Sequence, residues 1–314
     1  MEHMVEVNHL VKTYGKGKVR AVDDLSLYIN QGEILGLLGP NGSGKSTTIN
    51  CLLSLLSFQS GEIRVFGKEM QPNAYDIKKK IGVVFQEVAV FEELTVYENI
   101  NYFCGLYITD KKIREEYVND AIRLVGLQEF QKFRPKQLSG GLLRRLNIAC
   151  GIAHKPEFII LDEPTVAVDP QSRNHILEGI RKLQKQGATV LYTSHYMEEV
   201  EQLCSRIVII DKGKVIASGT KEELIELIHT SEKVTIELTE IKEEQILYLR
   251  ELEHVKEVLF DGSKLLISYE TGEHNLSRLV DYLKKEKISY TKIFSELPSL
   301  NDVFLELTGK ELRD

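Results

Sequence analysis

The chain lacks several features that mark other classes of protein. None of its apolar runs approaches the ~20 residues that a membrane-spanning helix needs. Its formal net charge is −7, whereas a nucleic-acid-binding surface usually carries a basic excess. The N-terminal residues 1–6 have neither the cationic start nor the apolar core of a secretory signal. We therefore expect a cytoplasmic protein that binds no nucleic acid.

Cysteine is also scarce, and low-complexity tracts and internal repeats are absent. The cysteines are far apart and form no C-x-x-C pair, which disfavours a metal centre or a disulfide framework; they are Cys51, Cys104, Cys150 and Cys204. The 314 residues are enough for about two domains. A content of 42% hydrophobic and 28% charged residues is ordinary for a globular protein, so the chain has the means to build a core.

What the chain does contain is a complete glycine-rich phosphate loop. The pattern G-x-x-x-x-G-K-[ST] is matched by Gly39, Pro40, Asn41, Gly42, Ser43, Gly44, Lys45 and Ser46. A strand candidate (33–38) precedes the loop, and a helix candidate that starts at Thr47 follows it. In this setting backbone N–H groups and the positive end of a helix converge on phosphate oxygens. Lys45 would then reach the β- and γ-phosphates of a nucleoside triphosphate, and the Ser46 hydroxyl would bind Mg²⁺.

Strand and helix patterns alternate through the first ~230 residues, which predicts an α/β core with a mainly parallel sheet. The almost continuously apolar runs suit strands that are covered on both faces; they are 34–38, 81–85, 158–161, 189–192 and 207–210. The stretch from about 87 to 155 contains helical patterns and no good strand. We interpret it as a helical subdomain inserted into the core.

After Thr230 the character of the sequence changes. Alternating residues from Val234 to Leu238 indicate a half-buried strand, and the following patterns continue in the order of a β-α-β-β-α-β, ferredoxin-like module. A last helix is expected near 298–307. We therefore predict a first domain over 1–230 and a small α+β accessory domain over 231–314.

Two further segments carry candidate chemistry. The apolar run 158–161 ends in Asp162 and Glu163, at the edge where open α/β sheets bind their ligands. Asp162 would hold Mg²⁺, and Glu163 would polarise the water that attacks the γ-phosphate. Ser139, Gly140 and Gly141 open a helical segment and present free N–H groups to an anion. Taken alone, the acids could be a solvated strand end, and the serine an ordinary helix cap.

In combination these segments resemble the ATPase subunits of ABC transporters over about residues 4–230. The loop at Gly39–Ser46 matches Walker A, residues 160–163 match Walker B, and residues 138–141 match the signature motif. Other family elements follow in their expected order: the Q-loop glutamine at Gln86, the D-loop aspartate at Asp169, the switch histidine at His195 and the adenine-stacking aromatic at Tyr14.

The resemblance implies an ATP- and Mg²⁺-dependent ATPase. It places Glu163, His195, Gln86 and Lys45 in catalysis, and Ser46, Gln86 and Asp162 around the magnesium ion. It places Tyr14, the residues from Gly39 to Thr47, and Asp169 at bound ATP. It also implies a second nucleotide-binding subunit, a copy or a sister chain, whose ATP would meet the signature residues Ser139, Gly140 and Gly141. It also implies a separate polytopic permease, so the chain would sit on the inner face of the cell membrane.

Two departures and two alternatives accompany this resemblance. Leu142 stands where the signature motif usually has glutamine, and residues 165–168 replace the small polar residues common in the D-loop. The tail near 298–309 resembles that of exporter-type subunits, which favours export of a drug, antibiotic, lipid or polysaccharide. One alternative is a soluble ABC ATPase that acts on ribosomes or DNA. The other is a nucleotide-binding regulator without hydrolysis, against which the intact Glu163 and His195 argue.

Overall fold

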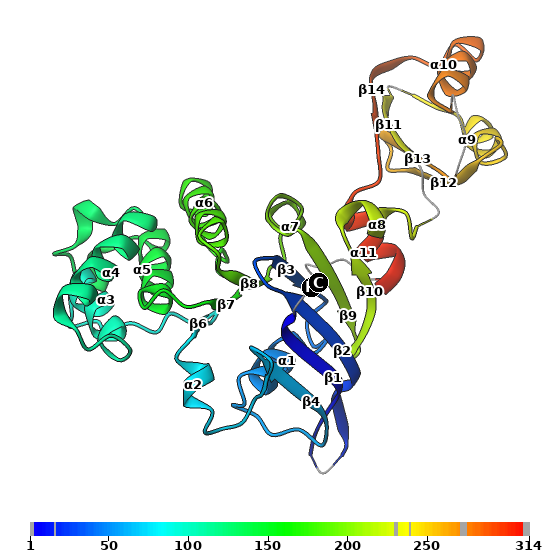
Figure 1. Cartoon of the computed structure of the whole chain (residues 1–314). Helices are drawn as coiled ribbons and strands as arrows, with labels where there is room; N and C mark the ends of the chain where they lie inside the picture. Colours follow the sequence, from blue (N-terminus) through cyan, green and yellow to red (C-terminus); the bar gives the residue numbers. More distant parts are fainter. Residues whose placement is uncertain (1–2, 16, 229–231, 239, 271–274, 310–314) are drawn as a thin grey trace. The chain divides into compact units, whose positions relative to one another are not determined.

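The computed structural model describes residues 3–15, 17–228, 232–238, 240–270 and 275–309 (Figure 1). Within these ranges the chain forms two compact units, which meet in sequence between Lys221 and Glu222. The domain boundary predicted between residues 230 and 231 lies outside the described residues. Each unit has a hydrophobic core of its own.

The first unit is built on a mainly parallel sheet with the strand order β10-β9-β3-β8-β7-β6. Its strands are β3 (Ile34–Leu38), β6 (Ile81–Val84), β7 (Phe158–Asp162), β8 (Thr189–Thr193), β9 (Arg206–Asp211) and β10 (Lys214–Gly219). Neighbours from β9 to β6 pair in parallel, and β10 runs antiparallel to β9. Every residue of β3, β7 and β8 is buried, as expected for strands covered on both faces. The predicted α/β core is confirmed.

A second, antiparallel sheet with the order β2-β1-β4-β5 lies outside the strands that the sequence predicts. It consists of β1 (His3–Tyr14), β2 (Val19–Asn30), β4 (Ser60–Val65) and β5 (Lys68–Glu69). The pairing of β1 with β2 shifts register between Val7 and Leu10 and again at Lys12. Such bulges interrupt the alternation of buried and exposed side chains, which is the signal that would have indicated the strand.

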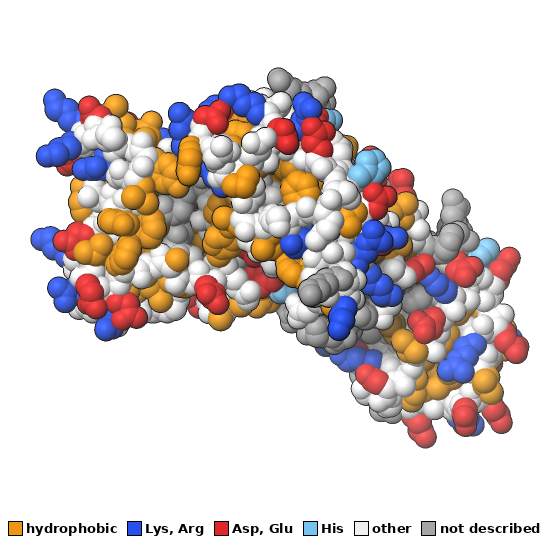
Figure 2. Space-filling model, turned by 90° about the horizontal axis from the view of Figure 1, so that it is seen from below, with side chains coloured by type: hydrophobic (Ala, Val, Ile, Leu, Met, Phe, Trp, Pro, Cys, Tyr) orange, Lys and Arg blue, Asp and Glu red, His pale blue; other side chains and the backbone are white. Residues whose placement is uncertain are grey.

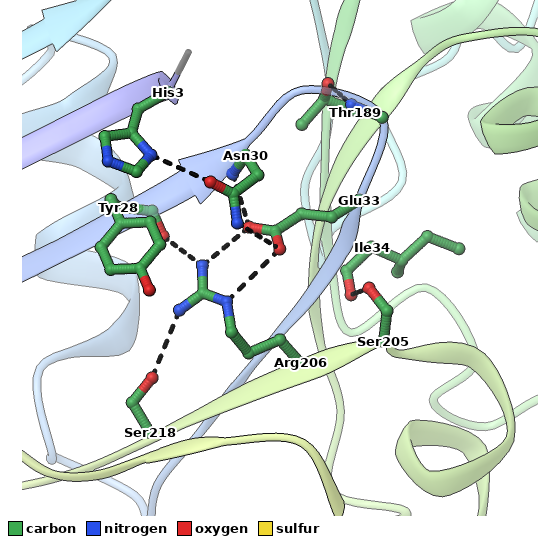
Figure 3. A network of polar contacts seen from close by, with 10 residues as sticks. His3, Tyr28, Asn30, Glu33, Ile34, Thr189, Ser205, Arg206 and Ser218 are labelled. Carbon is green, nitrogen blue, oxygen red and sulfur yellow. Dashed lines mark hydrogen bonds and ion pairs between the residues drawn. The ribbon is translucent and has the colours of Figure 1, made fainter. Parts of the chain in front are cut away.

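An ion pair between Arg206 and Glu33, whose side chains are 13% and 11% exposed, ties the two sheets together (Figure 3). Arg206, at the start of β9, donates to Glu33 Oε1 at 2.7 Å and to the carbonyl oxygen of Tyr28 at 2.6 Å. Its guanidinium lies 4.2 Å from the centre of the Tyr28 ring, a favourable cation–π distance. Glu33 also accepts the backbone N–H of Asn30 at 2.6 Å. The contacts fix the turn between β2 and β3.

Helices cover the parallel sheet and form a separate cluster between β6 and β7 (Figure 1). The first set is α1 (Lys45–Leu52), α2 (Tyr75–Lys78), α6 (Pro170–Lys185) and α7 (Met197–Leu203), whereas α8 (Lys221–Ile225) begins where the second unit begins. The cluster is α3 (Val96–Gly105), α4 (Lys111–Leu124), α5 (Gly140–Ile152) and the short 3₁₀ turns η1 (Gln128–Phe130) and η2 (Pro135–Gln137). This cluster occupies the stretch predicted to be a helical subdomain. Sharp signals delimit its helices: a Thr95–Glu98 capping box starts α3, and Gly126, with φ +66°, follows the end of α4.

The second unit contains a β-α-β-β-α-β succession followed by a helix. The elements are β11 (Glu232–Leu238), α9 (Glu243–Arg250), β12 (Val255–Phe260), β13 (Lys264–Tyr269), α10 (Asn275–Lys285), β14 (Tyr290–Glu296) and α11 (Leu300–Thr308). The sheet order is β12-β13-β11-β14, with antiparallel neighbours. Alternate residues of β11 and β13, together with α9 and α10, form the core. The assignment of this unit to the ferredoxin-like class stays a prediction.

Candidate active site

The glycine loop after β3 is packed so tightly that its glycines have no substitute. A Cβ on Gly39 would lie 2.4 Å from the carbonyl oxygen of Ile210, far inside van der Waals contact. Gly44 has φ +108°, and a Cβ there would lie 2.5 Å from the carbonyl oxygen of Ala21. Gly39 therefore allows the loop to approach β9, and Gly44 allows it to approach β2 in a conformation that other residues rarely adopt.

The loop leads into a helix whose N-terminus is prepared for an anion. Helix α1 begins after Gly44 with no side-chain cap and no acid in its first turn. Lys45 is buried, and its ammonium donates to the carbonyl oxygens of Gly39 at 2.6 Å and Pro40 at 3.2 Å. Burial lowers the pKa of Lys45 below its ordinary value, whereas the carboxylates of Glu163 and Asp162 raise it. This basic group and the uncapped helix start fit a phosphate chain.

Two acids and a threonine lie side by side where β7 and β8 end. Register pairs Asp162 with Thr193 across the two strands, and the Thr193 hydroxyl donates to Asp162 Oδ1 at 2.6 Å. The same hydroxyl oxygen accepts the backbone N–H of Glu163 at 2.9 Å. Burial raises the pKa of Asp162, and the hydrogen bond from Thr193 opposes this rise. Thr193 thus positions both acids, a role that the sequence analysis did not assign.

Glu163 contacts the histidine that follows β8. His195 Nε2 donates to Glu163 Oε1, and this hydrogen bond is the main reason why the pKa of Glu163 is lowered. His195 Nδ1 is buried without a hydrogen-bond partner among the described residues. Glu163 has φ +50°, a left-handed conformation that costs roughly 1–2 kcal/mol for a residue with a Cβ. The surrounding bonds must hold it there.

A third buried carboxylate, Glu199 on α7, supports the segments that carry these residues. It accepts hydrogen bonds from the hydroxyls of Thr165 at 2.7 Å, Tyr192 at 2.7 Å and Ser194 at 2.8 Å. Thr165 lies two residues after Glu163, and Ser194 directly precedes His195. Glu199 therefore links the loop after β7 to the loop after β8, although the sequence analysis did not single it out.

Tyr14 and Gln86, which the sequence predicts at the nucleotide, both come near these groups. The Tyr14 hydroxyl lies 3.5 Å from the hydroxyl of Thr47, in the first turn of α1. Lys12 Nζ lies 5.1 Å from the centre of the Tyr14 ring. The side chain of Gln86 is exposed, and its carbonyl oxygen accepts a 2.6 Å hydrogen bond from Arg144, which also bonds the Glu163 carbonyl. Arg144 was not predicted as a site residue.

The signature residues form a second group next to Asp169. Ser139 caps α5 by accepting the N–H of Leu142 at 3.3 Å, and both Ser139 and Gly140 are exposed. A Cβ on Gly141 would lie 2.6 Å from Asp169 Oδ2, so the signature loop and the D-loop pack against each other. Asp169 in turn caps α6 by accepting the N–H of Ser172 at 2.9 Å. The loop therefore presents its serine to solvent.

The available ligands suit magnesium bound together with phosphate. Among the described residues, no group of three or more His, Cys, Asp or Glu could hold a metal ion alone. Magnesium is usually bound by one or two protein oxygens, water and substrate phosphates. The Asp162 carboxylate at the end of β7 and the Ser46 hydroxyl in the first turn of α1 are oxygen donors of this kind.

Comparison with known proteins assigns this chain to a family. Residues 22–166 match the family model described as ABC transporter. The linearmycin resistance ATP-binding protein LnrL of Bacillus subtilis (strain 168) is 39% identical over 99% of this chain and 100% of its own length. The Nod factor export ATP-binding protein I of Ralstonia nicotianae is 33% identical over 99% of this chain and 95% of its own length. This chain belongs to the ABC transporter family.

A solved structure agrees with this assignment. The dimeric, post-hydrolysis ATP-binding cassette MJ0796, bound to ADP and Pi, superposes with a TM-score of 0.63 and 28% identity, covering 69% of this chain and 98% of the cassette. This chain is therefore an ATP-binding subunit of an ABC transporter, an ATPase that uses ATP and Mg²⁺. None of its described helices combines the length and apolar character needed to cross a membrane.

Proposed function

We propose that this subunit drives export through a separate membrane permease, with hydrolysis performed by the group at the carboxyl edge of the parallel sheet. The observation that carries the proposal is the contact between Glu163 and His195. The Glu163 carboxylate is also close enough to Lys45 to raise the pKa of that lysine. Lys45 and the loop N–H groups hold the phosphates, and Ser46, Asp162 and Gln86 serve the magnesium ion. The ion held there would supply the positive charge that neutralises the developing phosphate charge.

Each remaining residue has a role that follows from its place. Glu163 polarises the attacking water. The hydrogen bond from His195 lowers the pKa of Glu163, so the carboxylate stays ionised and can accept a hydrogen bond from that water. His195 orients Glu163, and its buried Nδ1 remains for a further polar partner. Tyr14 stacks on the adenine, as its place beside Thr47 supports. The backbone N–H groups of residues 39–44 contact the phosphates, and Thr47 follows them in the first turn of α1.

The exposed Ser139 points to nucleotide bound by another subunit. Ser139 caps α5 and Gly140 and Gly141 begin it, a helix start suited to an anion, and Gly141 packs against Asp169. We infer that they complete the ATP site of an opposing copy or sister chain. The dimeric state of the similar cassette supports this arrangement.

The permease would dock on the helical cluster. Residues after Gln86 expose several large hydrophobic side chains, among them Val88, Phe91, Tyr102, Leu106 and Tyr107. Figure 2 shows hydrophobic side chains gathered on the face of this cluster that is seen from below. Such a surface is typical of an interaction site, and it begins directly after the Q-loop. Docking there would hold the chain at the inner face of the membrane, and the names of the two relatives favour export.

The decisive experiment measures ATP-dependent dimerisation of the Glu163→Gln variant by light scattering. We expect a stable dimer with ATP and Mg²⁺, because the nucleotide is bound but not hydrolysed, and phosphate release close to background. A Glu198→Gln variant is the matched control, since Glu198 is an exposed acid nearby and should hydrolyse ATP normally. Normal phosphate release by Glu163→Gln would remove Glu163 from its role.

A second arm tests the contribution in trans. Adding Ser139→Arg to Glu163→Gln should abolish the ATP-dependent dimer while ATP still binds to the monomer. A dimer that persists in the double variant would contradict the proposed sandwich. Docking is tested by coexpression with a candidate polytopic permease: Tyr102→Lys should prevent copurification while leaving the ATPase rate of the isolated subunit unchanged.

A further inference from the structure

Arg144 is a buried arginine whose whole guanidinium is used on backbone carbonyl oxygens. Its Nη1 donates to Phe85 at 3.1 Å and to Gln86 at 2.6 Å. Its Nη2 donates to Glu163 at 2.5 Å and to Asp162 at 3.4 Å, and its Nε donates to Pro164 at 2.9 Å. The side chain is only 4% exposed. One side chain therefore joins the backbone at the end of β6 to the backbone that follows β7.

The Glu163 peptide is held from both sides. Thr193 accepts the N–H of Glu163 at 2.9 Å, and Arg144 binds its carbonyl oxygen. Because Glu163 has the strained φ of +50°, these bonds determine where its carboxylate points. Without the bond to Arg144, the peptide after Glu163 could relax and turn the carboxylate away from His195.

Arg144 also brings a distant helix into this arrangement. It lies on α5, five residues after Ser139, which caps the same helix. At 1.5 Å per residue this corresponds to about 7.5 Å along the helix axis. The guanidinium is thus a rigid connection from the helix that carries the signature loop to Glu163 and to the Q-loop backbone.

We propose that Arg144 is a positioning residue for ATP hydrolysis, which holds the Glu163 peptide in its productive conformation and couples it to Gln86 and to the signature helix. It touches no reacting atom and acts through the backbone. The planar fork of five donors is essential, because an ammonium cannot reach carbonyl oxygens in two separate segments. This inference rests on the proposed role of Glu163.

Arg145 is the natural comparison. It is the next residue on the same helix, carries the same charge and also bonds backbone carbonyls, those of Val125 at 3.0 Å and Gly126 at 3.4 Å. Those carbonyls lie at the end of α4, inside the helical cluster. A general effect of losing a carbonyl-bonding arginine from α5 would therefore appear in both variants, whereas an effect on Glu163 would appear only at Arg144.

The experiment compares steady-state ATP hydrolysis by Arg144→Met, Arg144→Lys, Arg145→Met and Glu163→Gln, with thermal melting of each. We expect Arg144→Met to lower kcat about tenfold or more, since small misplacements of a reacting group can cost up to about 10²-fold. KM for ATP should stay within about threefold, because the phosphate loop is untouched. Arg144→Lys should recover little of the rate, and Arg145→Met should keep kcat within about twofold.

The outcomes separate this inference from the proposed function. Equal kcat losses in Arg144→Met and Arg145→Met, a full rate in Arg144→Lys, or a rise in KM without a loss of kcat would each overturn the positioning role. If Arg144→Met melts too low to assay, Arg144→Lys alone decides, since it keeps the charge and the stem. Normal turnover by Glu163→Gln would instead refute the assignment of Glu163.

Discussion

The hydroxyl of Thr193 donates to Asp162 Oδ1 across two neighbouring parallel strands, at 2.6 Å. It also accepts the N–H of Glu163, so one threonine sets the geometry of an acid assigned to magnesium and of an acid assigned to water. Thr193 has no assigned catalytic role of its own, but it positions Asp162 and Glu163, which do.

Thr193→Val should slow ATP hydrolysis about tenfold or more, the equivalent of 1.4 kcal/mol in the barrier. Valine keeps the volume but leaves Asp162 Oδ1 and the Glu163 N–H without this partner. The free energy of unfolding should fall by about 2 kcal/mol for the same reason. Phosphate release and urea titration measure the two effects. Thr193→Ser, which retains the hydroxyl, should keep most of the activity; equal losses in both variants would contradict this explanation.

Lys45→Ala should weaken ATP binding about 10- to 100-fold, because a charge-assisted hydrogen bond contributes roughly 1.5–3 kcal/mol. The measurement is a nucleotide titration by calorimetry. Lys79→Ala is the control, since Lys79 is an exposed lysine that follows α2. Unchanged affinity in Lys45→Ala would show that the loop lysine does not contact the phosphates.

Arg206→Leu should lower the free energy of unfolding by about 2 kcal/mol, because the Glu33 carboxylate, whose side chain is only 11% exposed, would lose its charged partner. ATP affinity should change little, since Glu33 lies on the turn before β3 and Arg206 at the start of β9, and neither lies on the loop after β3. The double variant Glu33→Leu/Arg206→Leu should be less destabilised than the sum of the single changes. Strict additivity in urea titrations would mean that the two residues do not interact.

Stability should decrease as the pH falls from about 6.5 to 4, partly because of His154. Burial lowers the pKa of this histidine to about 4 in the folded protein, against an ordinary value of 6.5. Below pH 6.5 the unfolded chain therefore binds a proton that the folded chain does not, and unfolding is favoured. The difference corresponds to about 3 kcal/mol at and below pH 4. In His154→Gln this part of the pH dependence should disappear; an unchanged slope would refute the assignment.

The parts of the site that could be predicted are those encoded in continuous segments. The loop from Gly39 to Ser46 has a local reason for every glycine and is flanked by the strand and helix that it needs. Asp162 and Glu163 end an unbroken apolar run, which identifies the strand and its last residues. The order of these segments along the chain was enough to indicate the family.

The residues that sequence reasoning missed act through contacts between distant segments. The partners of Arg144 are carbonyl oxygens 18 to 59 residues away, and no side-chain pattern marks a carbonyl. In the sequence it resembles Arg145, an ordinary cation on a helix. Thr193 resembles any strand threonine until the register with Asp162 is known.

The close packing of the phosphate loop has a consequence for the whole first unit. Gly44 rests on a carbonyl of the antiparallel sheet, that of Ala21, whereas Gly39 rests on one of the parallel sheet, that of Ile210. The loop therefore packs against both sheets and connects them, in addition to forming the ligand site. Because a ligand that binds only the folded protein stabilises it by linkage, bound ATP should raise the free energy of unfolding of both sheets, a region much larger than the residues that ATP touches.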